Sequence, residues 1–488
     1  MHASSILEKV PTQLLLGGGW SAGSTAATIP VIDPATEEVL TEVASATPED
    51  GLAAVTAAAE AGPRWAALPA RQRAEVLRRT FELMTAEAES LARLIVLENG
   101  KALPDARSEI AYAAEFFRWY AEEAVRNEGS LVTSPSGSNR IMVLHQPIGV
   151  SLLVTPWNFP AAMATRKIGP ALAAGCSVIL KPASETPLTA LAVGEILQRA
   201  GVPAGVVNVL PARDAGTFAR VLLADDRVRK LSFTGSIEVG RLLLREAADS
   251  IVDSSMELGG NAPFIVFDDA DVDAAVEGAM LAKMRNGGQA CTAANRFYVH
   301  ERVADEFTTR FATAMGKLSV GPGLDAGVDV GPLISRAAQT SMSEIVGLAT
   351  QQGGEVVVGG DHAGPGYFYR PTVVSGVHAD SLLIRDEIFG PIAPIVTFGP
   401  DDDVVALAND SHFGLSAYVY TRDLSRALRV SEALEYGMVG VNRGILSDPA
   451  APFGGVKQSG LGREGGHEGM LEFTEAKYVS VDWGSGRG

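Results

Sequence analysis

The protein has 488 residues, of which 47% are hydrophobic and 20% are charged. This length exceeds what one hydrophobic core usually serves, so we expect more than one domain. The net charge of −18 disfavours nucleic acid and anionic membrane as partners, because both require a basic face.

The composition carries no signal for secretion or membrane insertion. No stretch approaches about 18 uninterrupted apolar residues, the length of a transmembrane helix. Residues 1–10 lack the basic region and apolar run of a secretory signal. The two cysteines argue against a disulfide framework and for a reducing compartment. We therefore predict a cytoplasmic protein.

The first part of the chain is predicted to contain short strands and then helices. Residues 14–45 have the pattern of short strands and turns, and a helical pattern begins at Pro48. Apolar residues of 71–98 recur with a period close to 3.6, which predicts a helix that stops at Asn99-Gly100. Another helix is predicted over about 105–125.

A small polar segment, 129–139, predicts a loop or hairpin tip. Strands and helices alternate beyond it, which is typical of a mostly parallel sheet with helices on both faces. The predicted strands are 150–154, 177–180, 206–209 and 230–233, and the predicted helices are 187–200 and one from about 237.

A second α/β series begins near Asn261. Its predicted strands are 264–267, 296–299, 355–358, 394–398, 416–420 and 438–441, and its predicted helices are 271–283 and 304–317. Residues 472–482 alternate like a strand. An edge strand far from its own domain often pairs with another subunit.

Cys291 lies in a glycine-containing stretch beside Gln289 and Thr292. A thiol becomes a strong nucleophile only as a thiolate, helped by a base, a cation or backbone N–H groups. The alternative is a buried core cysteine, the usual state of a free thiol. Taken locally, the two interpretations are about even, whereas Cys176 precedes an apolar strand and is predicted to be a core residue.

Two further residues could serve that thiol. Glu257, between Met256 and Leu258, could be a general base, because an apolar setting raises the pKa of a carboxyl group. Its alternative is a solvated loop residue. Asn158, in a turn fixed by two prolines, could donate its amide N–H to a developing oxyanion. A local turn hydrogen bond is an equally good explanation.

Nucleotide-binding features follow two of the predicted strands. Lys181 and Ser184 come at the carboxyl end of the strand 177–180, where α/β folds bind nucleotides. Residues 233–236, before a helix with Gly240, could hold phosphate at the helix N-terminus. The spacing is not the G-x-G-x-x-G pattern and is a weak signal by itself. No His/Cys/Asp cluster has the spacing of a metal site, so none is predicted.

Together these stretches resemble the aldehyde dehydrogenase superfamily over nearly the whole chain, and within it succinate-semialdehyde dehydrogenases. The resemblance implies a Rossmann-like cofactor domain, an α/β catalytic domain and a small β oligomerisation arm. The motifs that carry it are Pro156-Trp157-Asn158-Phe159-Pro160, Lys181-Pro182-Ala183, Phe233-Thr234-Gly235-Ser236, Glu257-Leu258-Gly259-Gly260, Gly288-Gln289-Ala290-Cys291, Glu387-Ile388-Phe389-Gly390-Pro391 and Pro452-Phe453-Gly454-Gly455.

The resemblance implies that Cys291 is the nucleophile, Asn158 the oxyanion donor and Glu257 the base. It also implies a nicotinamide cofactor, with Lys181 and Glu387 on its riboses and Ser236 on its pyrophosphate. The remaining cofactor-binding residues are Thr155, Pro156, Trp157, Ser184, Gly235, Leu258 and Phe389.

The cofactor preference is predicted from Ser184. NAD-preferring relatives often have Glu there, which binds the ribose hydroxyls and repels a 2′-phosphate. We therefore expect NADP to be accepted and preferred over NAD, although the adjacent Glu185 could restore part of the repulsion. Two departures from the family pattern are Ala293, which removes a redox-switch cysteine, and the glycine-poor segment 211–216.

The substrate is predicted from two arginines. Succinate-semialdehyde dehydrogenases hold the distal carboxylate with arginines at the positions of Arg166 and Arg285. On a helix starting at Pro160, Phe159, Met163 and Arg166 share one side and could line a tunnel. Ser447 and Phe453 are predicted to add substrate contacts. The alternative for each arginine is a surface or interdomain salt bridge.

The predicted domains are 1–128 with 147–257 for the cofactor, 258–442 for catalysis, and 129–146 with 470–488 for a homodimeric or homotetrameric arm. The alternative substrates are glutarate or 2-oxoglutarate semialdehyde and broad aliphatic or aromatic aldehydes. A cofactor-free thiol hydrolase lacks a well-placed histidine, since the nearest is His300. A catalytically silent scaffold is disfavoured by the intact set of Cys291, Glu257 and Asn158.

Overall fold

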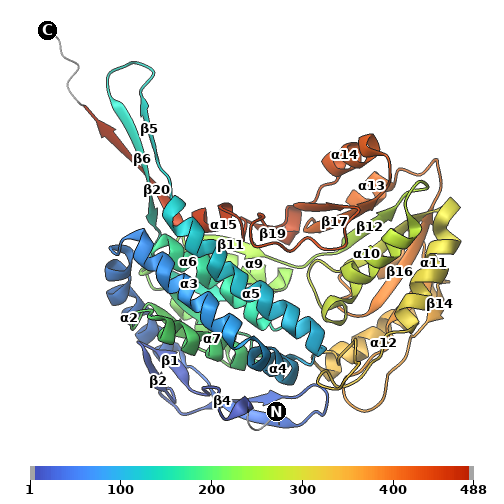
Figure 1. Ribbon diagram of the computed structural model, residues 1–488, viewed down its shortest axis with the longest axis horizontal. Helices are drawn as coiled ribbons and strands as arrows, with labels where there is room; N and C mark the ends of the chain where they lie inside the picture. The colour runs from blue at the N-terminus through green and yellow to red at the C-terminus, as the bar shows by residue number, and fades with distance from the viewer. Residues whose placement is uncertain (1–5, 483–488) are drawn as a thin grey trace.

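The computed structural model of the protein describes residues 6–482. Their strands form an 8-stranded sheet, a 7-stranded sheet, a 3-stranded sheet and a 2-stranded ribbon of β3 (Thr28–Ile32) and β4 (Val39–Ala44). The two large sheets lie in two lobes side by side, and the 3-stranded sheet projects from the body as an arm (Figure 1). The predicted α/β fold class is confirmed.

The 8-stranded sheet has the order β19-β11-β10-β7-β8-β9-β1-β2. Its parallel strands are β7 (Val150–Val154), β8 (Ser177–Lys181), β9 (Val207–Val209), β10 (Val228–Thr234) and β11 (Asp253–Glu257). β1 (Leu14–Leu16) pairs antiparallel with β9 and with β2 (Gly19–Ser21), and β19 (Gly460–Leu461) pairs antiparallel with β11. The order reverses between β7 and β10, and such a switch point is where α/β folds bind ligands.

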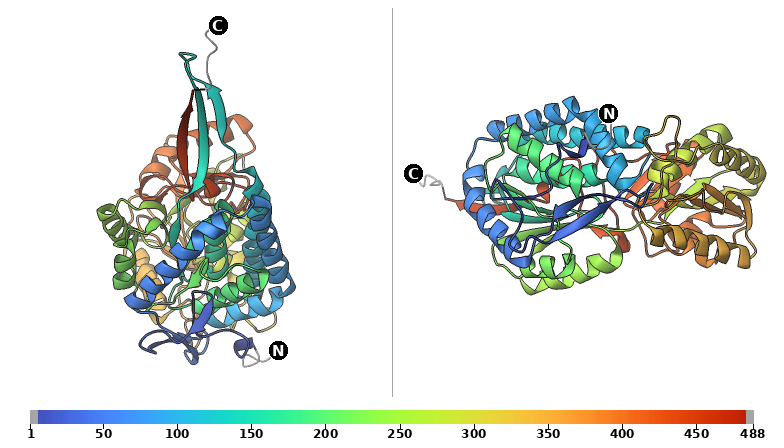
Figure 2. Two further views of the ribbon diagram at one scale, coloured as in Figure 1. Left: turned by 90° about the vertical axis from the view of Figure 1, so that its left-hand side faces the viewer. Right: turned by 90° about the horizontal axis from the view of Figure 1, so that it is seen from below.

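Helices cover both faces of this sheet (Figure 2). Alternating strand residues explain this, because Leu153 belongs to one hydrophobic core and its neighbour Leu152 to the other. The first core is covered by α3 (Ala70–Ala86), α4 (Ala88–Asn99), α5 (Leu103–Glu123), α6 (Pro160–Ala174) and α7 (Pro187–Ala200). The second is covered mainly by α2 (Pro48–Ala66), α8 (Ala215–Leu223) and α9 (Ile237–Asp249).

The 7-stranded sheet has the order β14-β15-β16-β13-β12-β17-β18 and is parallel except for β14 (Glu355–Val358). Its other strands are β12 (Ala262–Val266), β13 (Ala294–His300), β15 (Thr372–Ser375), β16 (Ile392–Phe398), β17 (Ser416–Tyr420) and β18 (Met438–Val441). One face packs against α10 (Val272–Met284) and α11 (Glu301–Gly316). The other packs against α12 (Arg336–Gln351), α13 (Val404–Asn409) and α14 (Leu424–Ala433).

The arm consists of β5 (Ser130–Thr133), β6 (Arg140–Pro147) and β20 (Thr474–Val481) in the order β20-β6-β5. The C-terminal strand β20 pairs along its length with β6 of the same chain. The segment predicted as a loop or hairpin tip is therefore part of a hairpin, and its turn lies between β5 and β6.

Residues 71–98, for which the period predicted one helix, form two. α3 ends at Ala86 and α4 begins at Ala88, because Glu87 leaves helical geometry with φ −104° and ψ 10°. No glycine or proline stands near the break, so the sequence gives no local signal for it.

We propose the predicted domain division for this chain, with β19 added to the cofactor lobe because it pairs with β11. Residues 1–5 and 483–488, which the division includes, lie outside the described residues.

Candidate active site

A cavity of about 240 Å³ lies where loops after β7, β10 and β11 face the segments that precede β13 and β16. It is lined by the three predicted catalytic residues Cys291, Glu257 and Asn158. The predicted residues Pro156, Trp157, Met163, Gly235, Ser236, Leu258, Glu387 and Phe389 also line it. Residues more than 100 positions apart in the sequence thus meet at one switch point.

Cys291 lies just before β13, where two glycines allow close backbone approach. A Cβ atom on Gly260 would lie 2.2 Å from the carbonyl oxygen of Cys291, and one on Gly288 would lie 2.2 Å from that of Gly390. Burial raises the pKa of the Cys291 thiol to about 12. The thiol is therefore protonated near neutral pH and requires a base before it can attack.

Glu257 ends β11 and is almost fully buried. Neither of its carboxyl oxygens has a hydrogen-bond partner among the described residues. Burial raises the pKa of Glu257 well above its usual value, and the negative charge of Glu464 raises it further. A buried carboxyl group with free oxygens and a raised pKa has the properties of a general base that faces a reacting group or water.

Glu464 forms buried ion pairs with Arg166 and Lys167, two neighbours on α6. Lys167 Nζ also donates to Ser232 Oγ at 2.9 Å. Burial tends to raise the pKa of Glu464, but Arg166 and Lys167 outweigh it and lower that pKa. Glu464 therefore stays charged and acts electrostatically on Glu257.

Asn158 follows β7 and lies in the turn before α6. One of its amide hydrogens is donated from Nδ2 to the carbonyl oxygen of Gln289 at 3.1 Å, which connects the turn to the cysteine segment. Its Oδ1 atom is buried without a hydrogen-bond partner among residues 6–482. The second amide hydrogen can be directed into the cavity that Asn158 lines.

Glu387 and Phe389 line the cavity from the second lobe. Glu387 Oε1 accepts a hydrogen bond from the backbone N–H of Gly260 at 3.1 Å, and burial raises its pKa to about 8. The Phe389 ring packs edge-on against Trp157, with centroids 5.5 Å apart. Phe389 has φ +50°, which is strained for a residue with a side chain. Strained backbone conformations of this kind cluster at functional sites.

The residues predicted to bind nucleotide lie at the carboxyl ends of neighbouring strands. Ser236 caps α9, accepting from the Val239 N–H at 3.3 Å, and the Oγ1 atom of the adjacent Thr234 is buried without a partner among the described residues. Burial lowers the pKa of Lys181 to about 8. A helix N-terminus, a buried lysine and unpartnered polar atoms fit a dinucleotide with phosphate and ribose groups.

Thr155, Lys181 and Ser184 do not line the cavity itself. The Thr155 N–H donates to the carbonyl oxygen of Lys181 at 3.2 Å, so the ends of β7 and β8 stay together. Ser184 Oγ donates to the carbonyl oxygen of Ala212 at 3.4 Å. These residues border the nucleotide side of the switch point.

Arg285 lies at the C-terminal end of α10 and contacts two residues of the predicted substrate set. Its Nη1 donates to Ser447 Oγ at 3.3 Å, and its guanidinium carbon lies 5.4 Å from the centre of the Phe159 ring. Within residues 6–482 no carboxylate forms an ion pair with Arg285. The side chain is half-buried, and its positive charge acts on the Asp105 carboxyl and on the Cys291 thiol, although burial dominates the pKa of both groups.

Arg166 has a different environment from Arg285. It is 1% exposed, pairs with Glu464 and donates from Nη2 to Met163 Sδ at 3.2 Å. Its guanidinium carbon lies 4.3 Å from the centre of the Phe453 ring. Arg285, Ser447, Phe159, Arg166 and Phe453 do not line the 240 Å³ cavity, whereas Met163 lies between it and Arg166.

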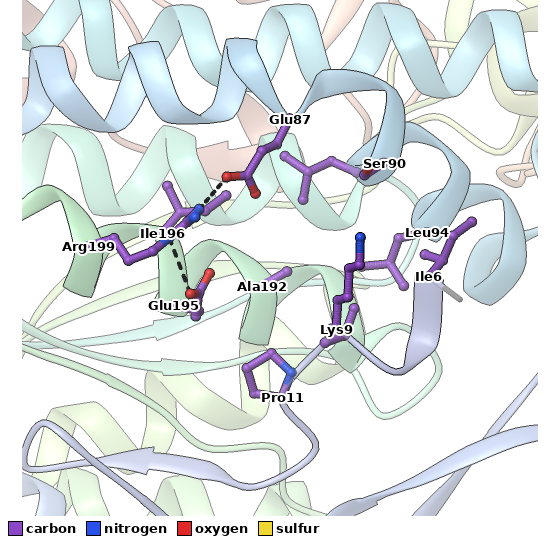
Figure 3. Close-up of a pocket in the computed structure, with 12 residues that line it drawn as sticks. Ile6, Lys9, Pro11, Glu87, Ser90, Leu94, Ala192, Glu195, Ile196 and Arg199 are labelled. Atoms are coloured by element: carbon purple, nitrogen blue, oxygen red, sulfur yellow. Dashed lines mark hydrogen bonds and ion pairs between the residues drawn. The ribbon is translucent and has the colours of Figure 1, made fainter. Parts of the chain in front are cut away.

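A second cavity, of about 390 Å³, lies between the N-terminal segment, α4 and α7 (Figure 3). Three of its charged side chains pair with one another, since Arg199 contacts both Glu87 and Glu195. It contains none of the cysteine, amide and carboxyl groups that meet around Cys291. The smaller cavity is therefore the candidate active site.

Several residues near the site had no predicted role. Glu464 and Lys167 form an ion pair across 297 positions, and a pair so far apart in the sequence has no local signal. Tyr418, on β17, donates to the carbonyl oxygen of Thr292 at 2.8 Å. The described part of the chain contains no cluster of three or more His, Cys, Asp or Glu side chains placed to hold a metal ion. It also contains no helix long and apolar enough to cross a membrane.

The chain is similar to proteins of known activity along most of its length. It is 54% identical over 444 residues to a succinate-semialdehyde dehydrogenase of Paenarthrobacter nicotinovorans, covering 91% of this chain and 99% of that one. It is 50% identical to the succinate-semialdehyde dehydrogenase [NADP(+)] of Escherichia coli, covering 96% and 97%. It is 49% identical to a glutarate-semialdehyde dehydrogenase of Pseudomonas aeruginosa, with the same coverage.

The similarity extends from the sequence to the fold. The crystal structure of succinate-semialdehyde dehydrogenase from Burkholderia pseudomallei superposes with a TM-score of 0.96 at 48% identity, covering 98% of each chain. Residues 20–479 match the model of the aldehyde dehydrogenase family. The predicted resemblance is confirmed, and the chain belongs to the aldehyde dehydrogenase family.

Proposed function

We propose that this protein oxidises succinate semialdehyde to succinate with NADP or NAD as hydride acceptor. The observation that carries the substrate class is Arg285, a guanidinium that forms no ion pair among the described residues, donates to Ser447 and acts electrostatically on Cys291. An arginine fork matches a carboxylate because it can donate two parallel charge-assisted hydrogen bonds. Relatives named succinate-semialdehyde dehydrogenase at 54% and 50% identity support the assignment.

Cys291 is the proposed nucleophile. Glu257 takes the thiol proton, the Sγ thiolate adds to the aldehyde carbon, and the carbonyl oxygen becomes the alkoxide of a thiohemiacetal. The free amide hydrogen of Asn158 and the backbone N–H of Cys291 donate to that oxygen. Such donors stabilise negative charge as it develops, where a dry site makes the interaction strong.

A bound nicotinamide cofactor supplies the acceptor for the hydride that the aldehyde carbon loses. Ser236 and the N-terminus of α9 would hold its phosphates, and Lys181 and Glu387 its riboses. The oxidised acyl group remains on Cys291 as a thioester. Glu257 passes the thiol proton to solvent and then takes a proton from water. The resulting hydroxide attacks the thioester, the acid is released, and the departing Cys291 thiolate takes the proton back from Glu257.

The second candidate substrate is glutarate semialdehyde, which is favoured by the similarity to a glutarate-semialdehyde dehydrogenase at 49% identity. Both substrates have a distal carboxylate and differ by one methylene group. Recognition of one methylene is worth only about 1–3 kcal/mol, so the two activities can coexist in one site.

The proposal is tested by initial rates at fixed NADP and at fixed NAD. The substrates are succinate semialdehyde, glutarate semialdehyde, butanal and benzaldehyde. We expect the highest kcat/KM for succinate semialdehyde with NADP. A higher kcat/KM for butanal than for either semialdehyde would overturn the carboxylate assignment. Ester hydrolysis without aldehyde oxidation would favour the hydrolase alternative.

We also propose that the arm joins copies of this chain into a homodimer or homotetramer. Leu131 is 65% exposed and Tyr478 is 59% exposed on this projecting sheet, and both edges of the sheet are unpaired within the described residues. A cytoplasmic location is proposed because both cysteines are free. Light scattering after size-exclusion chromatography tests the assembly, and a monomer would contradict it.

A further inference from the structure

The segment that ends α4 contacts the turn that carries Asn158. Gly100 stops the helix with φ +91°, as predicted for this position. On either side of it, Asn99 Nδ2 donates to the carbonyl oxygen of Trp157 at 3.0 Å, and Lys101 Nζ donates to that of Asn158 at 2.7 Å. Two consecutive carbonyl groups of the turn are therefore held by one short segment.

Lys101 is fully buried and connects three parts of the site. Besides the Asn158 carbonyl, its Nζ contacts Glu109 Oε2 at 2.6 Å and lies 4.0 Å from the centre of the Phe159 ring. The other oxygen of Glu109 accepts the backbone N–H of Ala161 at 2.9 Å, in the first turn of α6. The pair thus holds both ends of the turn between β7 and α6.

A buried ion pair is weak evidence for stability, because desolvation offsets much of the attraction. The geometry gives this pair a more specific role. The side-chain amide of Asn158 has one hydrogen bond, to Gln289, and its Oδ1 has none among the described residues. Its orientation therefore depends on the backbone, whose carbonyl is held by Lys101 and by Asn286 Nδ2 at 2.9 Å.

We propose that Lys101 and Glu109 are positioning residues that hold the Asn158 amide at the oxyanion. The inference depends on the role proposed above for Asn158. Lys101 does not line the 240 Å³ cavity, and acts by holding the peptide between Asn158 and Phe159. Removing it leaves the Asn158 carbonyl with one donor, Asn286, in place of two, and leaves the buried Glu109 carboxylate without its cation.

The first test compares Lys101→Met with the parent enzyme. We expect kcat to fall about 10- to 100-fold, the effect of a displacement of about 1 Å at a reacting centre, with the KM for NADP changed less than about twofold. A primary deuterium isotope effect on kcat with 1-deuterated aldehyde should rise, because collapse of the alkoxide, the step that breaks the C–H bond, becomes slower.

Lys230→Met is the control. Lys230 is another fully buried lysine, paired with the exposed Asp253 and the partly exposed Glu472, and its pairs make no contact with the turn 155–160. The buried charge that Lys101→Met leaves on Glu109 is controlled by Glu109→Gln. We expect it to lower thermal stability and to leave kcat and the isotope effect unchanged. Equal losses of kcat in Lys101→Met and Lys230→Met would overturn the proposal.

A double-mutant cycle separates positioning from general structural damage. If Lys101 acts through Asn158, Lys101→Met should cost no further activity in an Asn158→Ala background. If Lys101→Met lowers kcat by the same factor in the parent enzyme and in Asn158→Ala, the inference is contradicted. Glu109→Gln keeps the side-chain shape and replaces Lys101→Met in the cycle if that variant does not fold. We expect it to lower kcat by a smaller factor.

The two proposals fail in distinguishable ways. If the substrate assignment is wrong, the parent enzyme turns over succinate semialdehyde no faster than butanal, and the cycle is measured with butanal. If the positioning role is wrong, the parent enzyme is active, and Lys101→Met lowers kcat by the same factor with and without Asn158→Ala.

Discussion

Replacing Arg285 with methionine should remove recognition of the distal carboxylate and leave the chemistry at Cys291 intact. Methionine keeps an unbranched side chain of similar length against the Phe159 ring, so packing changes little. A hydrogen bond to a charged group contributes about 1.5–3 kcal/mol, and about 1.4 kcal/mol corresponds to a tenfold change. We therefore expect kcat/KM for succinate semialdehyde to fall about 10- to 150-fold.

The assay is the initial rate of NADPH formation with succinate semialdehyde and with butanal, which has the same carbon chain without the carboxylate. Butanal oxidation should change less than about twofold. Arg310→Met is the control. It removes an exposed guanidinium of α11 that pairs with Asp273, and it should change the rate with neither substrate. Equal losses with both aldehydes would refute the carboxylate role of Arg285.

Arg285 is a cleaner probe than Arg166. The Arg166 guanidinium is already paired with Glu464 in a buried site. Removing one partner of a buried pair leaves an uncompensated charge and costs about 3–5 kcal/mol. A loss of activity in Arg166→Ala would therefore mix substrate recognition with a changed environment around Glu257.

Two further predictions concern the cofactor and the base. Ser184→Glu should lower the NADP over NAD ratio of kcat/KM by at least about tenfold, because a carboxylate there repels a 2′-phosphate, and an unchanged KM for NADP would contradict this. Glu464→Gln removes a negative charge that raises the pKa of Glu257. Glu257 should then lose its proton at lower pH, so the acid limb of the kcat profile should shift toward lower pH. A limb that stays in place or moves to higher pH would contradict the electrostatic coupling.

The strands and helices were predictable where the apolar pattern matched burial. The predicted strands 355–358, 416–420 and 438–441 and the predicted helix 187–200 have the observed limits. The break at Glu87 was not predictable, because the apolar residues of two consecutive helices can follow one uninterrupted helical period. The helix α12 was also missed, although Met342, Val346 and Ala349 carry its apolar face.

The catalytic residues could be predicted from the sequence only because several family motifs occur along the chain in the expected order. Locally, Cys291 and Asn158 each allowed a structural explanation, and the shared cavity supplies what no single stretch contains. The partners of these residues were beyond reach. Glu464 and Lys101 act through contacts with residues 297 and 57 positions away, and no periodicity or motif encodes such pairs.

The most direct test of the account is to trap the acyl group on Cys291. The parent enzyme is mixed with succinate semialdehyde and NADP and quenched in acid within one turnover, before the thioester is hydrolysed. Peptide mass spectrometry should find one succinyl group on Cys291, formed together with one equivalent of NADPH. Glu257→Gln should form neither the adduct nor NADPH at a comparable rate, because the base that takes the thiol proton is removed. An NADPH burst without an adduct on Cys291, or a Glu257→Gln variant that turns over at the parent rate, would contradict the central claim.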